Sequence, residues 1–129
     1  MTQQEMKART KRFALRIIRL VSSLPNTSVA NILGKQLLRS GSSVGANYRS
    51  ACRAKSTADF ISKLSIVEEE ADESFYWMEL LAESGIVTQT LLDDLMDEAN
   101  QIVSIVVAAI KTSKQKRNPK SPFPNPKST

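Results

Sequence analysis

Apolar residues recur at alternating spacings of three and four along most of the chain, which is the periodicity of amphipathic α-helices. Four such segments are separated by short polar stretches, and the pattern predicts helices over residues 4–24, 28–55, 57–84 and 89–115. Ser56 followed by Asp59 is typical of a capped helix start, and Gly85 is typical of a helix end. Because short connections make consecutive helices neighbours, we predict an all-α, antiparallel up-down-up-down four-helix bundle that occupies residues 1–116 as one domain.

The segment from Gln36 to Ala54 is central to the pattern, because its two faces differ in chemistry. On a helical wheel, one stripe has the spacing of a bundle core and consists of Leu33, Leu37, Ser40, Val44, Asn47 and Ala51. The opposite side carries cations separated by small residues, and these cations are Lys35, Arg39, Arg49 and Arg53. The second predicted helix therefore has a core seam with polar members and a basic outer face.

Gly41 and Gly45 lie between these two faces. A glycine inside a helix costs about 1 kcal/mol relative to alanine, so a pair spaced by four suggests a position where another backbone approaches closely. The fourth predicted helix also indicates assembly, because its apolar residues cover about 200° of the wheel, whereas a surface helix of a monomer needs little more than about 100°. We therefore predict a homo-oligomer whose interface includes Gly41, Gly45, Tyr48, Trp77, Val103, Ile105 and Val107.

Length and composition fit a single helical domain. The 129 residues are 41% hydrophobic and 24% charged, and an aromatic content of 5% favours an aliphatic helical core over a β-sandwich. One cysteine excludes an internal disulfide, and the first twelve residues are too polar for a signal peptide. The longest apolar run, residues 105–110, is far too short for a membrane span. These features predict a cytoplasmic protein without a membrane partner.

Charge is distributed very unevenly along the chain, whose net charge is +5. Residues 1–55 contain 11 basic and 1 acidic residue, and residues 56–110 contain 1 basic and 12 acidic residues. Residues 111–129 contain 6 basic residues and no acidic one. Such segregation allows basic helices to pair with acidic ones, within the bundle or between subunits, and it leaves basic ends for an anionic partner.

One flank of the first predicted helix carries a row of arginines at spacings of three and four, namely Arg9, Arg12, Arg16 and Arg19. Guanidinium groups bind phosphate oxygens through paired donors, so this row suits a nucleic-acid backbone. Pairing with carboxylates of the third helix accounts for the row equally well. The candidate nucleic-acid-binding set consists of these arginines, the four cations of the second helix, and Lys114, Lys116 and Arg117.

The chain offers few groups for catalysis or metal binding. An acidic cluster on the third predicted helix consists of Glu68, Glu69, Glu70, Asp72 and Glu73. Carboxylate-bridged metal sites of helical bundles also require histidine, and the sequence contains none. Without histidine and with a single cysteine, the usual zinc sites and the Cys–His and Ser–His–Asp nucleophiles are excluded. We predict no metal, no cofactor and no enzymatic activity. A small-molecule site or a carboxylate-only catalytic site is the alternative, and it would need a polar pocket at Ser40, Asn47, Ser74 and the carboxylates of the third helix.

From Lys111 the sequence becomes basic and then proline-rich, KTSKQKRNPKSPFPNPKST. Four prolines between Asn118 and Pro126 forbid a continuous helix, so residues 117–129 are predicted to form a disordered tail. Its lysines would add a flexible electrostatic contact to nucleic acid, or they would serve solubility alone.

The run QLLRSGSSVGANYRSACRAKSTADFISKLSIVEEEADESFYWMELL resembles a known family most closely in QLLRSGSSVGAN and EEADESFYW. It is similar to the bacterial four-helix-bundle family that includes the intervening-sequence proteins, named for open reading frames inside intervening sequences of 23S ribosomal RNA genes. The resemblance covers roughly residues 13–113 and leaves out the proline-rich tail. It implies a compact up-down bundle, a ring-shaped homo-oligomer such as a pentamer, and no established enzymatic activity.

The cationic faces support two functional hypotheses. In the first, the protein is a non-catalytic RNA- or DNA-binding module with little sequence preference, because its cations have no interleaved aromatic residues for base stacking. In the second, the same cations hold an assembly together or bind an acidic protein, and the protein is an interaction adaptor without nucleic-acid binding. The two hypotheses differ in whether the basic faces stay exposed after assembly.

Overall fold

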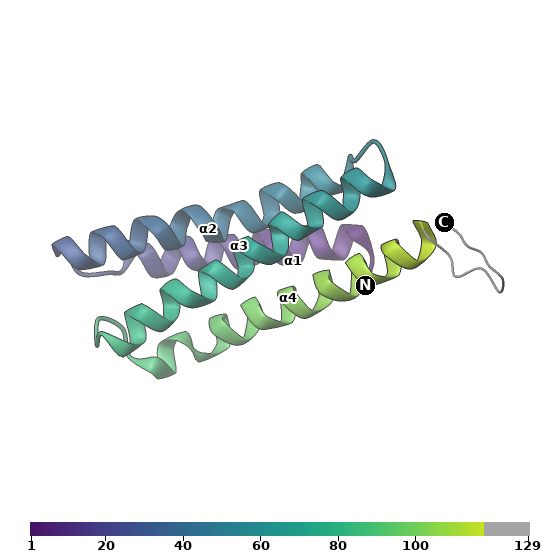
Figure 1. The fold of residues 1–129 in the computed structure, drawn as a ribbon. Coiled ribbons are helices and arrows are strands. Elements are labelled where there is room, and N and C mark those ends of the chain that lie inside the picture. Colours follow the sequence, from purple (N-terminus) through teal and green to yellow (C-terminus); the bar gives the residue numbers. More distant parts are fainter. Residues whose placement is uncertain (118–129) are drawn as a thin grey trace.

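Four α-helices make up the bundle in the computed structural model, which describes residues 1–117. They are α1 (Gln3–Ser22), α2 (Ser28–Cys52), α3 (Thr57–Glu83) and α4 (Gln89–Arg117). Each helix runs antiparallel to the next, so α1 begins and α4 ends at the same end of an elongated bundle (Figure 1). The predicted all-α four-helix bundle is confirmed. None of these described helices is both long enough and apolar enough to cross a membrane.

Local capping interactions define the helix starts. The Thr2 side chain accepts a hydrogen bond from the Glu5 backbone N–H at 3.0 Å, and Glu5 Oε1 accepts one from the Thr2 backbone N–H at 2.8 Å. The second of these bonds lowers the pKa of Glu5. Ser56 caps α3 by accepting from the Asp59 N–H at 3.1 Å, as predicted. Gly85 follows α3 with a φ of 79°, a conformation that glycine adopts without strain.

The helix ends differ slightly from the predicted ones. α1 ends at Ser22 instead of residue 24, and α2 ends at Cys52 instead of residue 55, because Arg53 has left the helical conformation with a φ of −105° and a ψ of 17°. α4 continues to Arg117, which the prediction places in the tail. The rest of the predicted disordered tail, residues 118–129, lies outside the described residues.

The core is one continuous cluster of apolar side chains contributed by all four helices. Its largest fully buried members are Phe13, Ile17, Leu37, Leu64, Met78, Leu81, Leu92 and Ile102. Three hydroxyl residues are also fully buried, namely Thr10, Ser40 and Ser74. The hydroxyl oxygens of Ser40 and Ser74 lie 2.9 Å apart, so a hydrogen bond inside the core fixes the register of α2 against α3.

α1 lies close against α2 along the face that contains the glycines. A β-carbon at Gly41 would lie 2.3 Å from Ile17 Cδ1, and one at Gly45 would lie 3.3 Å from Thr10 Oγ1. The close backbone approach that the glycine spacing predicts is therefore made by α1 of the same chain. α1 occupies the space beside both glycines, and a contact of Gly41 and Gly45 with another subunit stays a prediction.

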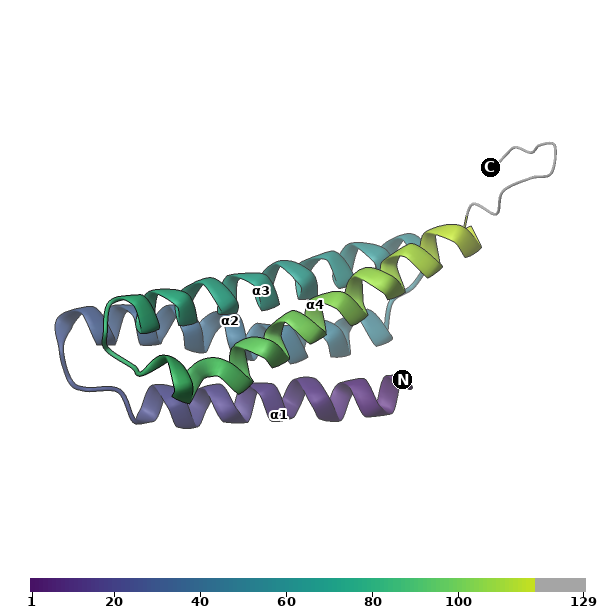
Figure 2. The same ribbon diagram turned by 90° about the horizontal axis from the view of Figure 1, so that it is seen from below.

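The packing places α2 at a corner of the bundle. α2 packs along its length on α1 and α3, while α4 packs mainly on α3, so α2 and α4 lie diagonally opposite each other, as do α1 and α3. α4 crosses α1 at an angle, and these two helices contact each other over only a short region (Figure 2). A corner helix exposes its outer face to solvent, which is where α2 carries its cations.

Candidate nucleic-acid interface

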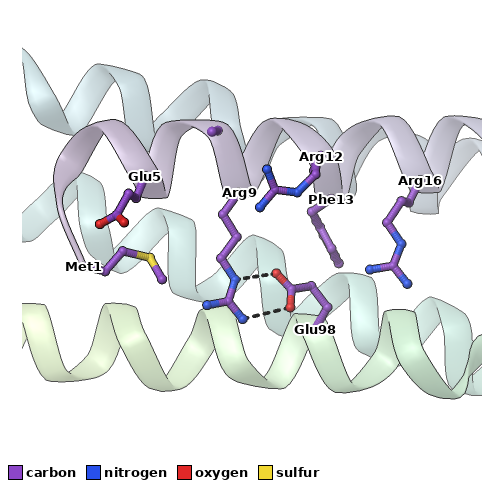
Figure 3. Close-up of a pocket in the computed structure, with 8 residues that line it drawn as sticks. Met1, Glu5, Arg9, Arg12, Phe13, Arg16 and Glu98 are labelled. Carbon is purple, nitrogen blue, oxygen red and sulfur yellow. Dashed lines mark hydrogen bonds and ion pairs between the residues drawn. The ribbon is translucent and has the colours of Figure 1, made fainter.

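Arg9, the first member of the predicted arginine row, forms an ion pair between α1 and α4. Its Nε lies 2.6 Å from Glu98 Oε2 and its Nη2 lies 2.8 Å from Glu98 Oε1 (Figure 3). Nη2 also donates to Gln101 Oε1 at 2.6 Å. The hydrogen bond to Glu98 raises the pKa of Arg9. Because both charged side chains are only 17% exposed, Arg9 connects two helices and is not a free cation.

The remaining members of the row divide between two environments. Arg12 and Arg16 border a cavity of about 560 Å³ between α1 and α4, together with Glu5 and Glu98 (Figure 3). Arg19 is exposed nearer the C-terminal end of α1. The alternative prediction, pairing with carboxylates of the third helix, is wrong for Arg9, whose partner lies on α4. The reason is topological, because α1 and α3 lie diagonally across the bundle.

Arg39, on the outer face of α2, is neutralised by α3. Its Nη1 lies 3.3 Å from Glu70 Oε1, and its Nη2 donates to Glu73 Oε2. The same oxygen of Glu73 accepts a hydrogen bond from Trp77 Nε1 at 3.0 Å. The hydrogen bond to Glu73, followed by the charge of Glu70, raises the pKa of Arg39. Arg39 therefore shares its charge with two carboxylates, although its side chain is half exposed.

Cations gather in two grooves at the end of the bundle where α2 ends. A groove of about 270 Å³ between α1 and α2 is lined by the cations Lys7, Lys11 and Arg49. A second groove, of about 470 Å³ between α2 and α3, is lined by the cations Arg49, Arg53, Lys55 and Lys63 and by Asp59. Arg49 belongs to both grooves, so the six cations of the two grooves form one surface, called here the Arg49 surface.

Carboxylates neutralise little of the Arg49 surface. Within residues 1–116, only one of its six cations is in an ion pair, since Lys63 Nζ lies 3.5 Å from Asp59 Oδ1. Asp59 Oδ2 also accepts from the Lys55 backbone N–H at 3.2 Å, so this carboxylate is used mainly to begin α3. The acidic cluster of α3 lies further along the helix, beside Arg39. Arg49 and Arg53 therefore have exposed guanidinium groups without an ion-pair partner among the described residues.

Small side chains form the surface between the cations. Ser42, Ala46 and Ser50 are exposed and follow one another at spacings of four along the outer face of α2. Aromatic rings do not contribute, since Tyr48 is 7% exposed and the most exposed aromatic residue among the described ones, Tyr76, lies in the C-terminal part of α3. The Arg49 surface can therefore bind phosphate groups, but it offers no ring on which a base could stack.

The other predicted nucleic-acid residues lie outside this surface. Lys35 is exposed on α2 toward the opposite end of the bundle. Lys114 and Lys116 are exposed near the end of α4, and Lys116 borders a cavity with Cys52 and Ser56, at the same end as the Arg49 surface. Arg117 is the last residue of α4, and its side chain lies outside the described part of the chain.

Four of the six surface cations were not among the sequence-predicted candidates, namely Lys7, Lys11, Lys55 and Lys63. Lys7, Lys11 and Lys63 are scattered along the flanks of their helices and Lys55 lies between α2 and α3, so no wheel groups them with Arg49. They could have been predicted from the antiparallel packing of the helices, which brings the start of α1, the end of α2 and the start of α3 together at one end of the bundle.

Most of the predicted interface residues are covered within the chain itself. Tyr48 is buried, where burial and then the neighbouring Cys52 raise the pKa of its phenol. Trp77, Val103 and Ile105 are half-buried and pack against the core cluster, whereas Val107 is 42% exposed. The wide apolar arc of α4 is thus largely used inside the bundle.

The polar residues of the core do not form a catalytic pocket. Ser40 and Ser74 are 0% exposed and hydrogen-bonded to each other. Asn47 donates a hydrogen bond to the Ser43 carbonyl of its own helix at 2.8 Å. Within the described range, no three carboxylate or cysteine side chains are grouped to hold a metal ion. The pocket that carboxylate-only catalysis would need is therefore closed by packing.

Fold and surface together define the class of this protein as an all-α four-helix bundle with a cationic surface at one end. A family model described as "23S rRNA-intervening sequence protein" matches residues 2–108, and the chain belongs to this family, as the sequence resemblance predicts. A similar solved structure is a protein with unknown function from the S23 ribosomal protein family of Bacteroides thetaiotaomicron VPI-5482. It has a TM-score of 0.80 and 38% identity, covering 86% of this chain and 99% of that one. No curated protein matches the chain.

Proposed function

We propose that this protein is a non-catalytic nucleic-acid-binding module that holds the phosphate backbone of RNA on the Arg49 surface. The observation that carries the proposal is the meeting of six cations in two adjoining grooves, from α1, α2, α3 and the connection between α2 and α3, with one carboxylate among them. The family description refers to ribosomal RNA, which favours RNA over DNA as the natural ligand.

Binding on this surface is electrostatic and largely independent of sequence. Arginine presents paired donors to phosphate oxygens, and lysine adds a compact charge. Phosphate contacts position a nucleic acid but carry no information about its bases. Each neutralised phosphate releases condensed counterions, so six contacts would give a slope of about −5 for the logarithm of affinity against the logarithm of salt concentration.

The test is the binding of a fluorescently labelled, folded RNA by anisotropy at low and moderate salt. Between about 50 and 200 mM salt, the affinity should fall on the order of 10³-fold. Arg49→Glu should weaken binding at least about tenfold, because it reverses a charge shared by both grooves. Lys35→Glu is the matched control, since it makes the same charge change on an exposed residue of the same helix. Equal losses in the two variants, or no binding at low salt, would overturn the proposal.

Assembly into a homo-oligomer, for which the family resemblance favours a pentamer, is a second proposal. It is supported by exposed apolar residues at the end of the bundle opposite the Arg49 surface, where Val29 is 56% and Ile32 is 62% exposed on the first turns of α2. Ile18, 43% exposed, lies on the neighbouring α1. The mass in solution tests this proposal, and Ile32→Asp should lower it. If Arg49→Glu also dissociates the assembly, the cations serve as an adaptor surface and not for RNA.

A further inference from the structure

The Arg49 surface consists of two cation rows separated by the width of one helix. Lys7 and Lys11 lie in the groove on the α1 side of α2, whereas Arg53, Lys55 and Lys63 lie in the groove on the α3 side. An α-helix with its side chains is about 10–12 Å across, so the two rows lie roughly that distance apart. Arg49 reaches both grooves from the outer face of α2. A single phosphate backbone cannot follow both grooves at once.

The outer face of α2 between the rows carries only small side chains, two of which have hydroxyl groups. Ser42, Ala46 and Ser50 are all exposed and all small. The Ser42 hydroxyl donates to the Leu38 carbonyl at 2.7 Å, which leaves its oxygen free to accept a hydrogen bond. We call these three residues the α2 crest. The crest can lie against a shallow surface, but it cannot reach the floor of a deep groove.

We propose that the Arg49 surface binds double-stranded RNA across its minor groove, with the α2 crest on the groove and one cation row on each strand. This inference rests on the proposed function and names its ligand. The minor groove of A-form RNA is wide and shallow and displays 2′-hydroxyl groups, which suits a low crest that bears hydroxyls. The two backbones that border the groove supply the two lines of phosphates that the two cation rows require.

Other nucleic acids fit this geometry less well. The minor groove of B-form DNA is only about 6 Å wide, which is too narrow for a helix. Its major groove admits a helix but is about 8.5 Å deep, and base readout there needs longer side chains than serine and alanine. Single strands are bound by stacking their bases on aromatic rings, which the Arg49 surface lacks.

The first experiment compares four labelled probes of one sequence with the unmodified, full-length protein. The probes are a 20-base-pair RNA duplex, the matching DNA duplex, an RNA duplex with 2′-O-methyl groups, and the single-stranded RNA. We expect the RNA duplex to bind at least about tenfold more tightly than the DNA duplex or the single strand, and 2′-O-methylation to weaken it several-fold. Equal affinity for all four probes, or a preference for DNA or single strands, would overturn this inference but leave the proposed function standing. No binding to any probe would overturn both.

The second experiment separates the two cation rows. Lys7→Gln with Lys11→Gln removes two cations from the α1 side, and Lys55→Gln with Lys63→Gln removes two from the α3 side, where Arg53 stays in place. Each pair should weaken binding of the RNA duplex by about tenfold or more, because each row holds one strand. Arg19→Gln with Lys35→Gln is the control, with the same loss of charge at exposed positions outside the two grooves. Loss of affinity in only one of the two pairs would overturn the two-strand geometry.

A third variant tests the crest directly. Ala46→Tyr places a large side chain on an exposed position between the rows and removes no charge. It should weaken the RNA duplex several-fold while leaving single-stranded RNA unchanged or bound more tightly, since an added ring can stack a base. An unchanged affinity for the duplex would show that the groove does not lie on the crest.

Discussion

The two sides of α2 are held by different kinds of contact. Toward α1 the contact is one of shape, because Gly41 has no side chain and Ile17 fills the space that a β-carbon would take. Toward α3 the contact is polar, through the buried hydroxyls of Ser40 and Ser74 and the ion pairs of Arg39. Shape fixes how close two helices come, whereas paired polar groups fix how far one helix is shifted along the other.

The charge of the α3 residues that face α2 changes along the contact, and this change creates the Arg49 surface. Arg39 lies beside Glu70 and Glu73, which neutralise it. Nearer the C-terminal end of α2, Arg49 and Arg53 lie in the groove between α2 and α3 together with Lys63. Arg39 is therefore paired with carboxylates of α3, whereas Arg49 and Arg53 are exposed to solvent, and the charges that α3 carries beside each arginine account for this difference.

The largest expected effect concerns the shape contact. Gly41→Val should lower the free energy of unfolding by about 1–3 kcal/mol, because the added side chain overlaps the fully buried Ile17. Chemical denaturation with urea measures the loss. Gly34→Ala is the control, since its β-carbon would meet only the ends of side chains, Leu24 Cδ1 at 2.9 Å and Val21 Cγ1 at 3.3 Å, and alanine gains about 1 kcal/mol of helix propensity.

The same contact can be tested by compensation. Ile17→Ala alone should cost about 2–5 kcal/mol as a cavity in the core. In the Gly41→Val background it should cost less, because the valine fills part of that cavity. Strictly additive losses would show that the two residues do not share space, and the steric account of the α1–α2 side would fail.

A smaller effect is expected on the polar side inside the core. Ser74→Ala should cost about 1 kcal/mol, because it removes the hydrogen bond with Ser40, and the double change with Ser40→Ala should cost less than the sum of the single ones. Ser65→Ala is the matched control, since this hydroxyl donates at 3.0 Å only to Ile61 O of its own helix. Additive losses at Ser40 and Ser74 would argue against a shared bond that fixes the register.

The exposed ion pairs of Arg39 with α3 should affect the tryptophan fluorescence more than the free energy of unfolding. Exposed ion pairs contribute little to folding, so Arg39→Gln should leave the urea midpoint nearly unchanged. It should shift the fluorescence of the single tryptophan, because Arg39 and Trp77 share the Glu73 carboxylate. Lys35→Gln should cause no shift. Arg39→Gln should also leave RNA affinity within about twofold, in contrast to Arg49→Gln; an equal loss in both would erase the difference between the two arginines.

Sequence periodicity predicts the helices of this bundle because the signals that start and stop them are local. Ser56 caps α3 through a residue three positions away, and Gly85 ends the same helix through its own backbone conformation. For the glycine pair, the sequence predicts one of two structural features. Its spacing indicates a close approach, but nothing in the pattern says whether the approaching helix belongs to the same chain, and it is α1 that fills the space at Gly41.

The Arg49 surface is predictable only in part because it forms across helices. The wheel of α2 identifies Arg49 and Arg53 but groups Arg39 with them, since a wheel contains no information about the carboxylates of α3. Lys7 and Lys63 lie on separate helices and join the surface only through packing. The wheel of α4 predicts an apolar arc too wide for a monomer, yet most of this arc is used inside the bundle. The angle at which α4 crosses the bundle explains this difference, because a crossed helix buries a wider apolar arc within its own chain (Figure 2).

The smallest expected effect is a pH dependence at Tyr48, on the buried face of α2. Burial raises the pKa of this phenol above its ordinary value of 10.0, so the fold favours the neutral form. The associated stability is therefore fully present below about pH 10 and is lost as the pH rises further, because the unfolded chain ionises first. Tyr48→Phe removes this dependence, and urea midpoints from pH 8 to 11 should fall less steeply in the variant than in the unchanged protein. All other side chains are the same in the two proteins, so the comparison isolates the phenol of Tyr48. Parallel curves above pH 10 would mean that the phenol is as free to ionise in the bundle as in the unfolded chain.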